Sequence, residues 1–150
     1  MDPGSPQYRL FLLLHGGAST SLLPVGQLPF GVRRKLGWSA KEVFVTTRDA
    51  QKIRYHPMHG MNAERGLQLP MVIRHGDYYR SARRGTELQI EVVLHEPDDP
   101  KRAYFLVLAR NKEDTGLFIR IFYYSSGISR SKMKGAETLL KQSTMNFFKA

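Results

Sequence analysis

The sequence predicts an α+β fold in which N-terminal helices pack on a four-stranded antiparallel β-meander, with a C-terminal helix. Two observations lead to this prediction. The second half of the chain holds four β-branched and aromatic segments separated by short stretches rich in Gly, Pro, Asn and Asp, a composition typical of turns. The first half holds short apolar segments that end at Gly or Pro, as helices often do.

The first 24 residues are expected to be a leader and a short apolar segment of uncertain role, and residues 25–150 to form a single domain. Pro3 and Pro6 disfavour regular structure at the start of the chain. The apolar run from Tyr8 to Leu14 is too short to span a bilayer. We interpret it as a buried strand or a helical turn in preference to the apolar part of a signal peptide.

Residues 15–31 are rich in Gly, Pro and small polar side chains, so a loop is expected there. A short helix is then expected over 32–37, ended by Gly37, because glycine adopts the backbone conformation that terminates many helices. The β-branched and aromatic run 43–47 predicts a strand.

Two further helical segments precede the meander. The first is expected to be capped by Thr47 or Asp49, to run to about Tyr55 and to stop before Pro57, which disfavours a helical conformation in the residue before it. The second is a short apolar helix or turn over 67–73.

The four strand segments are joined by connections too short for a parallel crossover, so they are expected to pair in order as an antiparallel meander. A basic helix capped by Ser129 or Ser131 is expected over 131–140. The predicted strands are 78–82, 88–95, 104–109 and 117–125.

The net charge and the absence of cysteine limit the partners and the chemistry that the chain can have. The chain has 23 Lys and Arg against 13 Asp and Glu, a formal net charge of +10, which favours nucleic acid as a partner first and an anionic membrane surface second. It has no cysteine, which excludes disulfides, cysteine-ligated zinc and a cysteine nucleophile. A cytoplasmic protein fits this composition, and a secreted one is also compatible with it.

His56 and His59 carry the clearest chemical signal. Imidazole titrates near neutral pH, so the pair can supply the acid and the base that RNA cleavage without a metal requires. Tyr124, Ser125 or Ser126 can position the phosphate by hydrogen bonds. Two alternatives stay open: the pair forms a hydrogen-bonded turn of purely structural role, or it contributes to a zinc site completed by His75 or Asp77.

Positive charge is concentrated around the two histidines. Between Arg48 and Arg84 there are eight Lys or Arg residues against three Asp or Glu. Such a segment suits a phosphate backbone, and the tyrosines within it, Tyr55, Tyr78 and Tyr79, can stack on unpaired bases. The residues expected to bind RNA are Arg54, Arg74, Tyr79, Arg83, Arg84 and Arg120.

The order of several short motifs resembles a known superfamily. The motifs are Val25-Gly26-Gln27-Leu28-Pro29, the strand 43–47, Lys52-Ile53 followed by His56 and His59, and the segment 69–73 ahead of a β-meander. In this order, over about residues 25–141, the chain resembles the phage-associated nuclease domains of the Barnase, EndoU, colicin E5/D and RelE-like superfamily.

The resemblance implies N-terminal helices on a four-stranded antiparallel sheet and a metal-independent ribonuclease activity that needs no cofactor. It assigns the catalytic histidine to His56 or His59, the basic residue of the first sheet strand to Arg80, and the last-strand position to Tyr124, Ser125 or Ser126. Such domains often act as toxins or as parts of phage and prophage proteins.

We therefore expect a metal-independent endoribonuclease with His56, His59, Arg80, Tyr124 and Ser126 in its catalytic site. The expected partners are RNA and an acidic immunity protein or antitoxin, with no membrane. The expected location is the cytoplasm, reached in some settings by phage or secretion-system delivery. The alternative is a non-catalytic module that binds nucleic acid or a phage partner protein.

Overall fold

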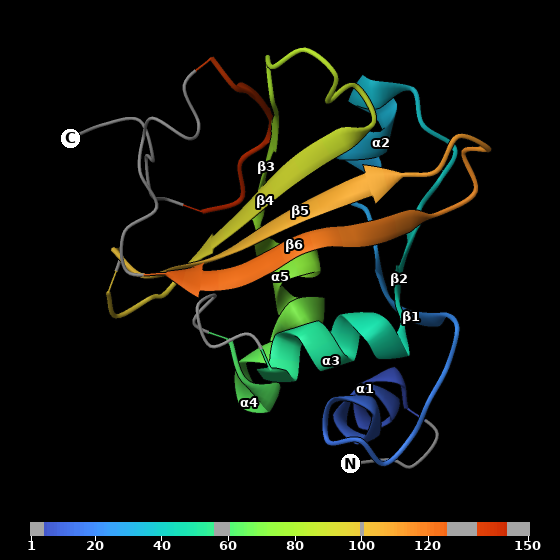
Figure 1. Ribbon diagram of the computed structural model, residues 1–150. Coiled ribbons are helices and arrows are strands. Elements are labelled where there is room, and N and C mark those ends of the chain that lie inside the picture. Colours follow the sequence, from blue (N-terminus) through green and yellow to red (C-terminus); the bar gives the residue numbers. More distant parts are fainter. Residues whose placement is uncertain (1–4, 56–60, 100, 126–134, 144–150) are drawn as a thin grey trace.

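The chain forms an α+β fold built on one seven-stranded mixed sheet (Figure 1). The computed structural model describes residues 5–55, 61–99, 101–125 and 135–143, apart from the side chains of Arg54 and Tyr55. The elements in chain order are α1 (Pro6–Leu14), β1 (Leu23–Gln27), α2 (Phe30–Leu36), β2 (Glu42–Val45), α3 (Thr47–Tyr55), α4 (Ala63–Gly66), α5 (Leu69–His75), β3 (Asp77–Arg80), β4 (Gln89–His95), β5 (Ala103–Arg110), β6 (Leu117–Ser125) and β7 (Glu137–Leu140).

The strand order is β1-β2-β6-β5-β4-β3-β7. Strands β3 to β6 are the four that the sequence predicts, and they pair antiparallel in the expected order. The sheet continues on both sides of them. β7 pairs antiparallel with β3, and β2 pairs parallel with the first residues of β6 before β1 completes the sheet. The prediction of a four-stranded antiparallel sheet with a C-terminal helix is therefore wrong.

Both missed strands lie where the local sequence signal is weak. Within the segment expected to be a helix, Glu137–Leu140 pairs with β3, because the open edge of β3 offers backbone partners that a short, weakly helical stretch does not supply itself. β1 lies inside the segment expected to be a loop. It buries Leu23 and Val25 and exposes Pro24 between them, a residue that an edge strand tolerates.

The apolar N-terminal run, expected to be a buried strand or a helical turn, forms the helix α1. The Ser5 side chain caps it by accepting a hydrogen bond from the Tyr8 amide at 3.1 Å. Leu10, Leu13 and Leu14 recur at helical spacing and are buried in the same core as the sheet residues. The N-terminal segment thus contributes to the core of residues 25–143.

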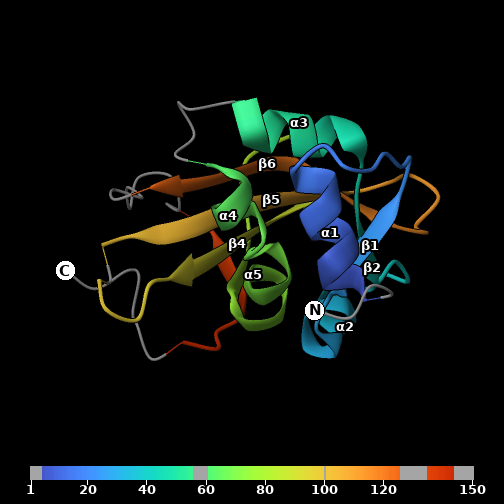
Figure 2. The ribbon, with the colours of Figure 1, turned by 90° about the horizontal axis from the view of Figure 1, so that it is seen from below.

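Helices α1, α3, α4 and α5 lie on one face of the sheet (Figures 1 and 2). The helix α2 begins at Phe30, packs against β7 and ends, as expected, at Gly37, whose φ of 69° is left-handed. Helix α3 lies beside β6. Because β2 pairs only with Leu117 and Phe118, no described strand covers the edge of β6 beyond those residues, and this opening positions the candidate site.

Candidate functional site

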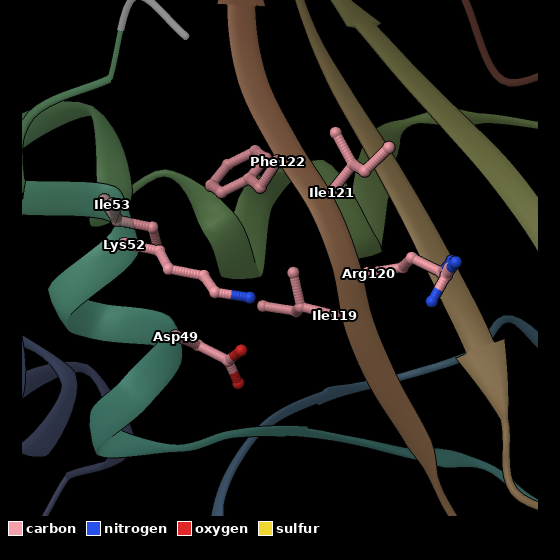
Figure 3. Close-up of a pocket in the computed structure, with 7 residues that line it drawn as sticks. All are labelled: Asp49, Lys52, Ile53, Ile119, Arg120, Ile121 and Phe122. Atoms are coloured by element: carbon pink, nitrogen blue, oxygen red, sulfur yellow. The ribbon is translucent and has the colours of Figure 1, made fainter. Parts of the chain in front are cut away.

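A cleft of about 220 Å³ lies between α3 and β6 (Figure 3). Helix α3 contributes Asp49, Lys52 and Ile53, which share one face because residues three and four apart are neighbours on a helix. Strand β6 contributes an apolar wall and its uncovered edge. The β6 residues that line the cleft are Ile119, Arg120, Ile121 and Phe122.

A reciprocal cap at the start of α3 fixes the orientation of Asp49. The Thr46 amide and hydroxyl donate to Asp49 Oδ2 at 2.9 and 3.0 Å, and the Asp49 amide donates to Thr46 Oγ1 at 3.1 Å. The capping residue is therefore Thr46, where the sequence suggested Thr47 or Asp49. No described residue donates to the other carboxylate oxygen, Oδ1, and Figure 3 shows the carboxylate at the cleft.

The side chains of Lys52 and Arg120, which both line the cleft, point in different directions. The Lys52 side chain extends from α3 towards Ile119, whereas Arg120 leaves β6 on the side away from α3 (Figure 3). The pairing of β5 with β6 shifts there, since Val107 is opposite Ile121 and Leu108 is opposite Ile119, which makes Arg120 a bulged residue. Arg120 therefore does not project beside Tyr124, as strict alternation along the strand would require.

The carboxyl end of β6 carries a stacked cluster. The Arg65 guanidinium of α4 lies 4.2 Å from the centroid of the Tyr124 ring, close enough for a cation–π contact. The Tyr104 ring of β5 lies 4.8 Å from that of Tyr124. Burial, with the carboxylate of Glu96 and the Tyr124 phenol nearby, raises the pKa of Tyr104 to about 12, so its hydroxyl stays protonated at neutral pH.

The predicted residues His56, His59 and Ser126 lie outside the described residues. Described residues near them in the chain lie on the cleft or at the end of β6 beside it. Ile53 lines the cleft two residues before the end of α3, and Arg65 of α4 stacks on Tyr124, one residue before Ser125 at the end of β6.

The structure does not bring Arg80 to this site. Arg80 lies on β3, and β4 and β5 separate that strand from β6 in the sheet, which amounts to about 14 Å at the usual strand spacing. Its Nε donates to Glu137 Oε2 of β7 at 3.0 Å, so its charge is paired at the opposite side of the sheet.

The residues expected to bind RNA are dispersed. Tyr79 is 1% exposed and Tyr78 is fully buried with its hydroxyl donating to the Ile73 carbonyl at 2.6 Å, so neither ring presents a face to a base. Arg74 is exposed on α5, beside a different pocket. Arg54 belongs to α3, but its side chain is not among the described parts; Arg83 and Arg84 are exposed in the turn after β3.

Sequence reasoning missed Lys52, Asp49 and Arg65 as members of one site. A signal was present for α4: Asn62 precedes it and caps it, accepting from the Arg65 amide at 2.7 Å. Recognising that cap would have placed Arg65 on a helix directly after the histidines. The proximity of α3 to the edge of β6 has no local signal, because it arises from the strand order.

Among the described residues no group of three or more His, Cys, Asp or Glu side chains is arranged to hold a metal ion. Asp77, considered above as a zinc ligand, accepts hydrogen bonds from the Gln142 and Ser143 amides at 2.6 and 2.9 Å. None of the described helices combines the length and the apolar character needed to cross a membrane.

Comparison of the chain with protein-family models, curated proteins and solved structures gave no match.

Proposed function

We propose that the protein is a metal-independent endoribonuclease whose reaction takes place at the carboxyl ends of α3 and β6. The observation that carries the proposal is the cluster at this end of the cleft. The Arg65 guanidinium and the Tyr104 and Tyr124 phenols gather at the end of β6, the strand that leads into Ser126, and Lys52 lies on α3, the helix that leads into His56.

In the proposed reaction one of His56 and His59 removes the 2′-hydroxyl proton, and that oxygen attacks the adjacent phosphorus. The other histidine donates a proton to the departing 5′-oxygen. The pentavalent phosphate carries additional negative charge, which Arg65 and Lys52 are suited to stabilise. Tyr124 supplies a hydroxyl donor at the same end. Arg65 thus takes the part that the resemblance gave to Arg80.

The test is cleavage of a labelled RNA by the purified protein in excess chelator. We expect cleavage products ending in a cyclic 2′,3′-phosphate, and a loss of about 100-fold or more in rate for each of His56→Gln and His59→Gln. His75→Gln is the matched control, because His75 is exposed at the end of α5 and belongs to neither α3 nor β6.

Intact RNA at high protein concentration would reject the endoribonuclease. Cleavage that persists in the His56→Gln, His59→Gln double variant would reject the assigned acid and base. Salt-sensitive RNA binding without cleavage would instead favour the alternative of a non-catalytic nucleic-acid-binding module.

A further inference from the structure

We infer that a second groove, the β1–α5 groove, docks an acidic peptide segment of a partner protein that carries one bulky apolar side chain. This groove shares no lining residue with the α3–β6 cleft. Pro29, the N-cap residue of α2, lines it, and α2 lies away from α3 in both views of the molecule (Figures 1 and 2). A segment bound there leaves the α3–β6 cleft open.

The β1–α5 groove lies where the two ends of the sheet approach each other. Strands β1 and β7 are first and last in the strand order, yet Val25 of β1 and Gln142, which follows β7, line the same groove. The side-chain amide of Gln142 donates to the carbonyl oxygens of Gly76 and Arg74 at 2.8 and 3.2 Å. These bonds hold the end of α5 against the segment after β7. The groove is therefore formed before a partner arrives, which reduces the conformational freedom lost on binding.

The walls of the groove are largely apolar. Its volume is about 400 Å³, within the range of roughly 300–1,000 Å³ found for ligand pockets. Pro29, Pro70 and Ile73 contribute apolar surface to it. The residues directly after the two prolines, Phe30 and Met71, are 68% and 47% exposed. Large apolar side chains left exposed beside an apolar groove are typical of a surface that binds another protein.

The charges around the groove are positive. Arg33 and Arg34 share a face of α2 with Phe30, because residues three and four apart are neighbours on a helix, and the Arg33 guanidinium lies 5.8 Å from the centroid of the Phe30 ring. On the β1 side Gln27 donates to the Glu42 carboxylate at 2.7 Å. Helices α2 and α5 contain no Asp or Glu, and their Lys and Arg residues form no ion pair in the described part of the chain: Arg33, Arg34, Lys35 and Arg74. Asp and Glu side chains of a partner would complement these cations.

The apolar walls favour a peptide over RNA as the occupant. RNA is held by cations at its phosphates and by aromatic faces on which its bases stack. The walls of the β1–α5 groove are aliphatic side chains and prolines, and the exposed ring beside it, Phe30, is contacted by Arg33. A bulky side chain inserted into an apolar pocket is the usual anchor of a protein interface, and charges at the rim add specificity.

The first experiment selects binding segments from random peptides of about 12 residues, roughly three helical turns, in a solution without RNA. We expect the selected peptides to share one Phe, Leu, Met or Trp flanked by Asp and Glu. The selected peptides are synthesised with a fluorescent label, and their affinity for the unmodified protein is measured by fluorescence anisotropy. This affinity should fall as salt rises, because part of it comes from charge.

The second experiment compares variants of the groove with matched controls. Arg74→Glu should weaken binding of the selected peptides about tenfold, and Met71→Ser about fivefold. The controls make the same changes elsewhere: Arg83→Glu in the exposed turn after β3, and Leu22→Ser at a residue that is 48% exposed. Both controls should keep the affinity within about twofold. Far-ultraviolet circular dichroism verifies that each variant is folded.

Three results would overturn the docking groove. One is a selection that yields no acidic peptides, or peptides that bind Arg74→Glu and Met71→Ser as tightly as the unmodified protein. Another is peptide binding that occurs only in a Phe147→Ser, Phe148→Ser variant, because the C-terminal residues of this chain would then be the occupant. The third is single-stranded RNA that displaces the peptides and binds Arg74→Glu much more weakly, which would assign the groove to RNA.

The peptide measurements need no RNA, so they are independent of the proposed ribonuclease. Cleavage of RNA is measured separately with and without saturating peptide. Equal rates are expected of a partner that leaves the α3–β6 cleft open, whereas cleavage blocked by the peptide would overturn the separation of the two sites.

Discussion

The β3–β7 edge and the α3–β6 cleft both gather charged side chains, but only one of them pairs those charges. At the β3–β7 edge Arg80 bonds to Glu137, and the buried Asp77 is satisfied by Lys141, Gln142 and Ser143. In the described part of the chain, Lys52 on the cleft has no ion-pair partner and one oxygen of Asp49 has no donor.

The charges at the β3–β7 edge stabilise the fold, whereas those on the α3–β6 cleft remain available to a ligand. A buried carboxylate must be compensated, because an uncompensated charge is costly to remove from water. A residue on an open cleft is solvated and carries no such requirement. Substitutions at the β3–β7 edge should therefore change stability, and substitutions at the cleft should change activity or binding.

The largest effect on stability is expected for Gly76→Ala, at the residue between α5 and β3. A Cβ at this position would lie 2.4 Å from a Val92 methyl and 2.6 Å from the Val72 carbonyl oxygen. The backbone must shift, and we expect a loss of about 3 kcal/mol in the free energy of unfolding, measured by urea denaturation. Gly31→Ala is the control: nothing lies within 4 Å of its Cβ, and this helical position should gain slightly in stability.

The largest effect on the functional side is expected for Arg65→Gln. Loss of a cation at the developing phosphate charge should lower kcat/KM for RNA cleavage about 100-fold while the protein stays folded. Arg80→Gln removes the same charge at the β3–β7 edge and should leave kcat/KM within about threefold of the unmodified protein, as expected of a surface ion pair. A larger loss of kcat/KM for Arg80→Gln than for Arg65→Gln would show that Arg80, and not Arg65, belongs to the catalytic site.

A smaller change is expected for Asp77→Asn. Burial by itself raises the pKa of Asp77, but hydrogen bonds from Ser143 and Gln142 and the charge of Lys141 outweigh it and hold the pKa below 3.8. The carboxylate therefore stabilises the fold fully above the unfolded pKa and loses this contribution as the pH falls through the folded pKa.

We expect Asp77→Asn to cost about 2 kcal/mol at pH 7, and the difference from the unmodified protein to shrink as the pH falls below 3.8. Urea denaturation at a series of pH values measures both effects. The exposed Asp98→Asn serves as the control for loss of a charge. A difference that is constant with pH would show that the charge of Asp77 is not what stabilises this edge.

The smallest effect is expected for Lys52→Gln in the binding of RNA. Loss of one phosphate contact should reduce the slope of log affinity against log salt by about 0.7, and affinity a few-fold at low salt. Lys112→Gln, in the exposed β5–β6 turn, should change neither quantity as much. Equal slopes for the two variants would remove Lys52 from the phosphate contacts.

Much of the secondary structure could be predicted because its signals are local. The β-branched runs of β3 to β6, the left-handed Gly37 and the Gly76 that follows α5 all act on their own neighbourhood. β1 and β7 could not be predicted in the same way. Each is four or five residues long and depends on a partner distant in sequence, β2 for one and β3 for the other.

The candidate site follows the same division. The chemistry of its members, the basic charge and the histidine pair are properties of the sequence. The strand order then decides which of these side chains lie close enough to act together. Arg65 of α4 contacts the Tyr124 ring at the end of β6. Arg80 lies on β3, which β4 and β5 separate from the strand of Tyr124.

The sequence by itself determined the α+β class, the antiparallel order of β3 to β6 and a formal net charge of +10. The tertiary structure alone decided that the sheet has seven strands, that β2 leaves most of one edge of β6 uncovered and that α3 forms a cleft there. The reason is that backbone propensity and turn chemistry act over a few residues, while the pairing of distant strand edges depends on what the whole chain can bury together.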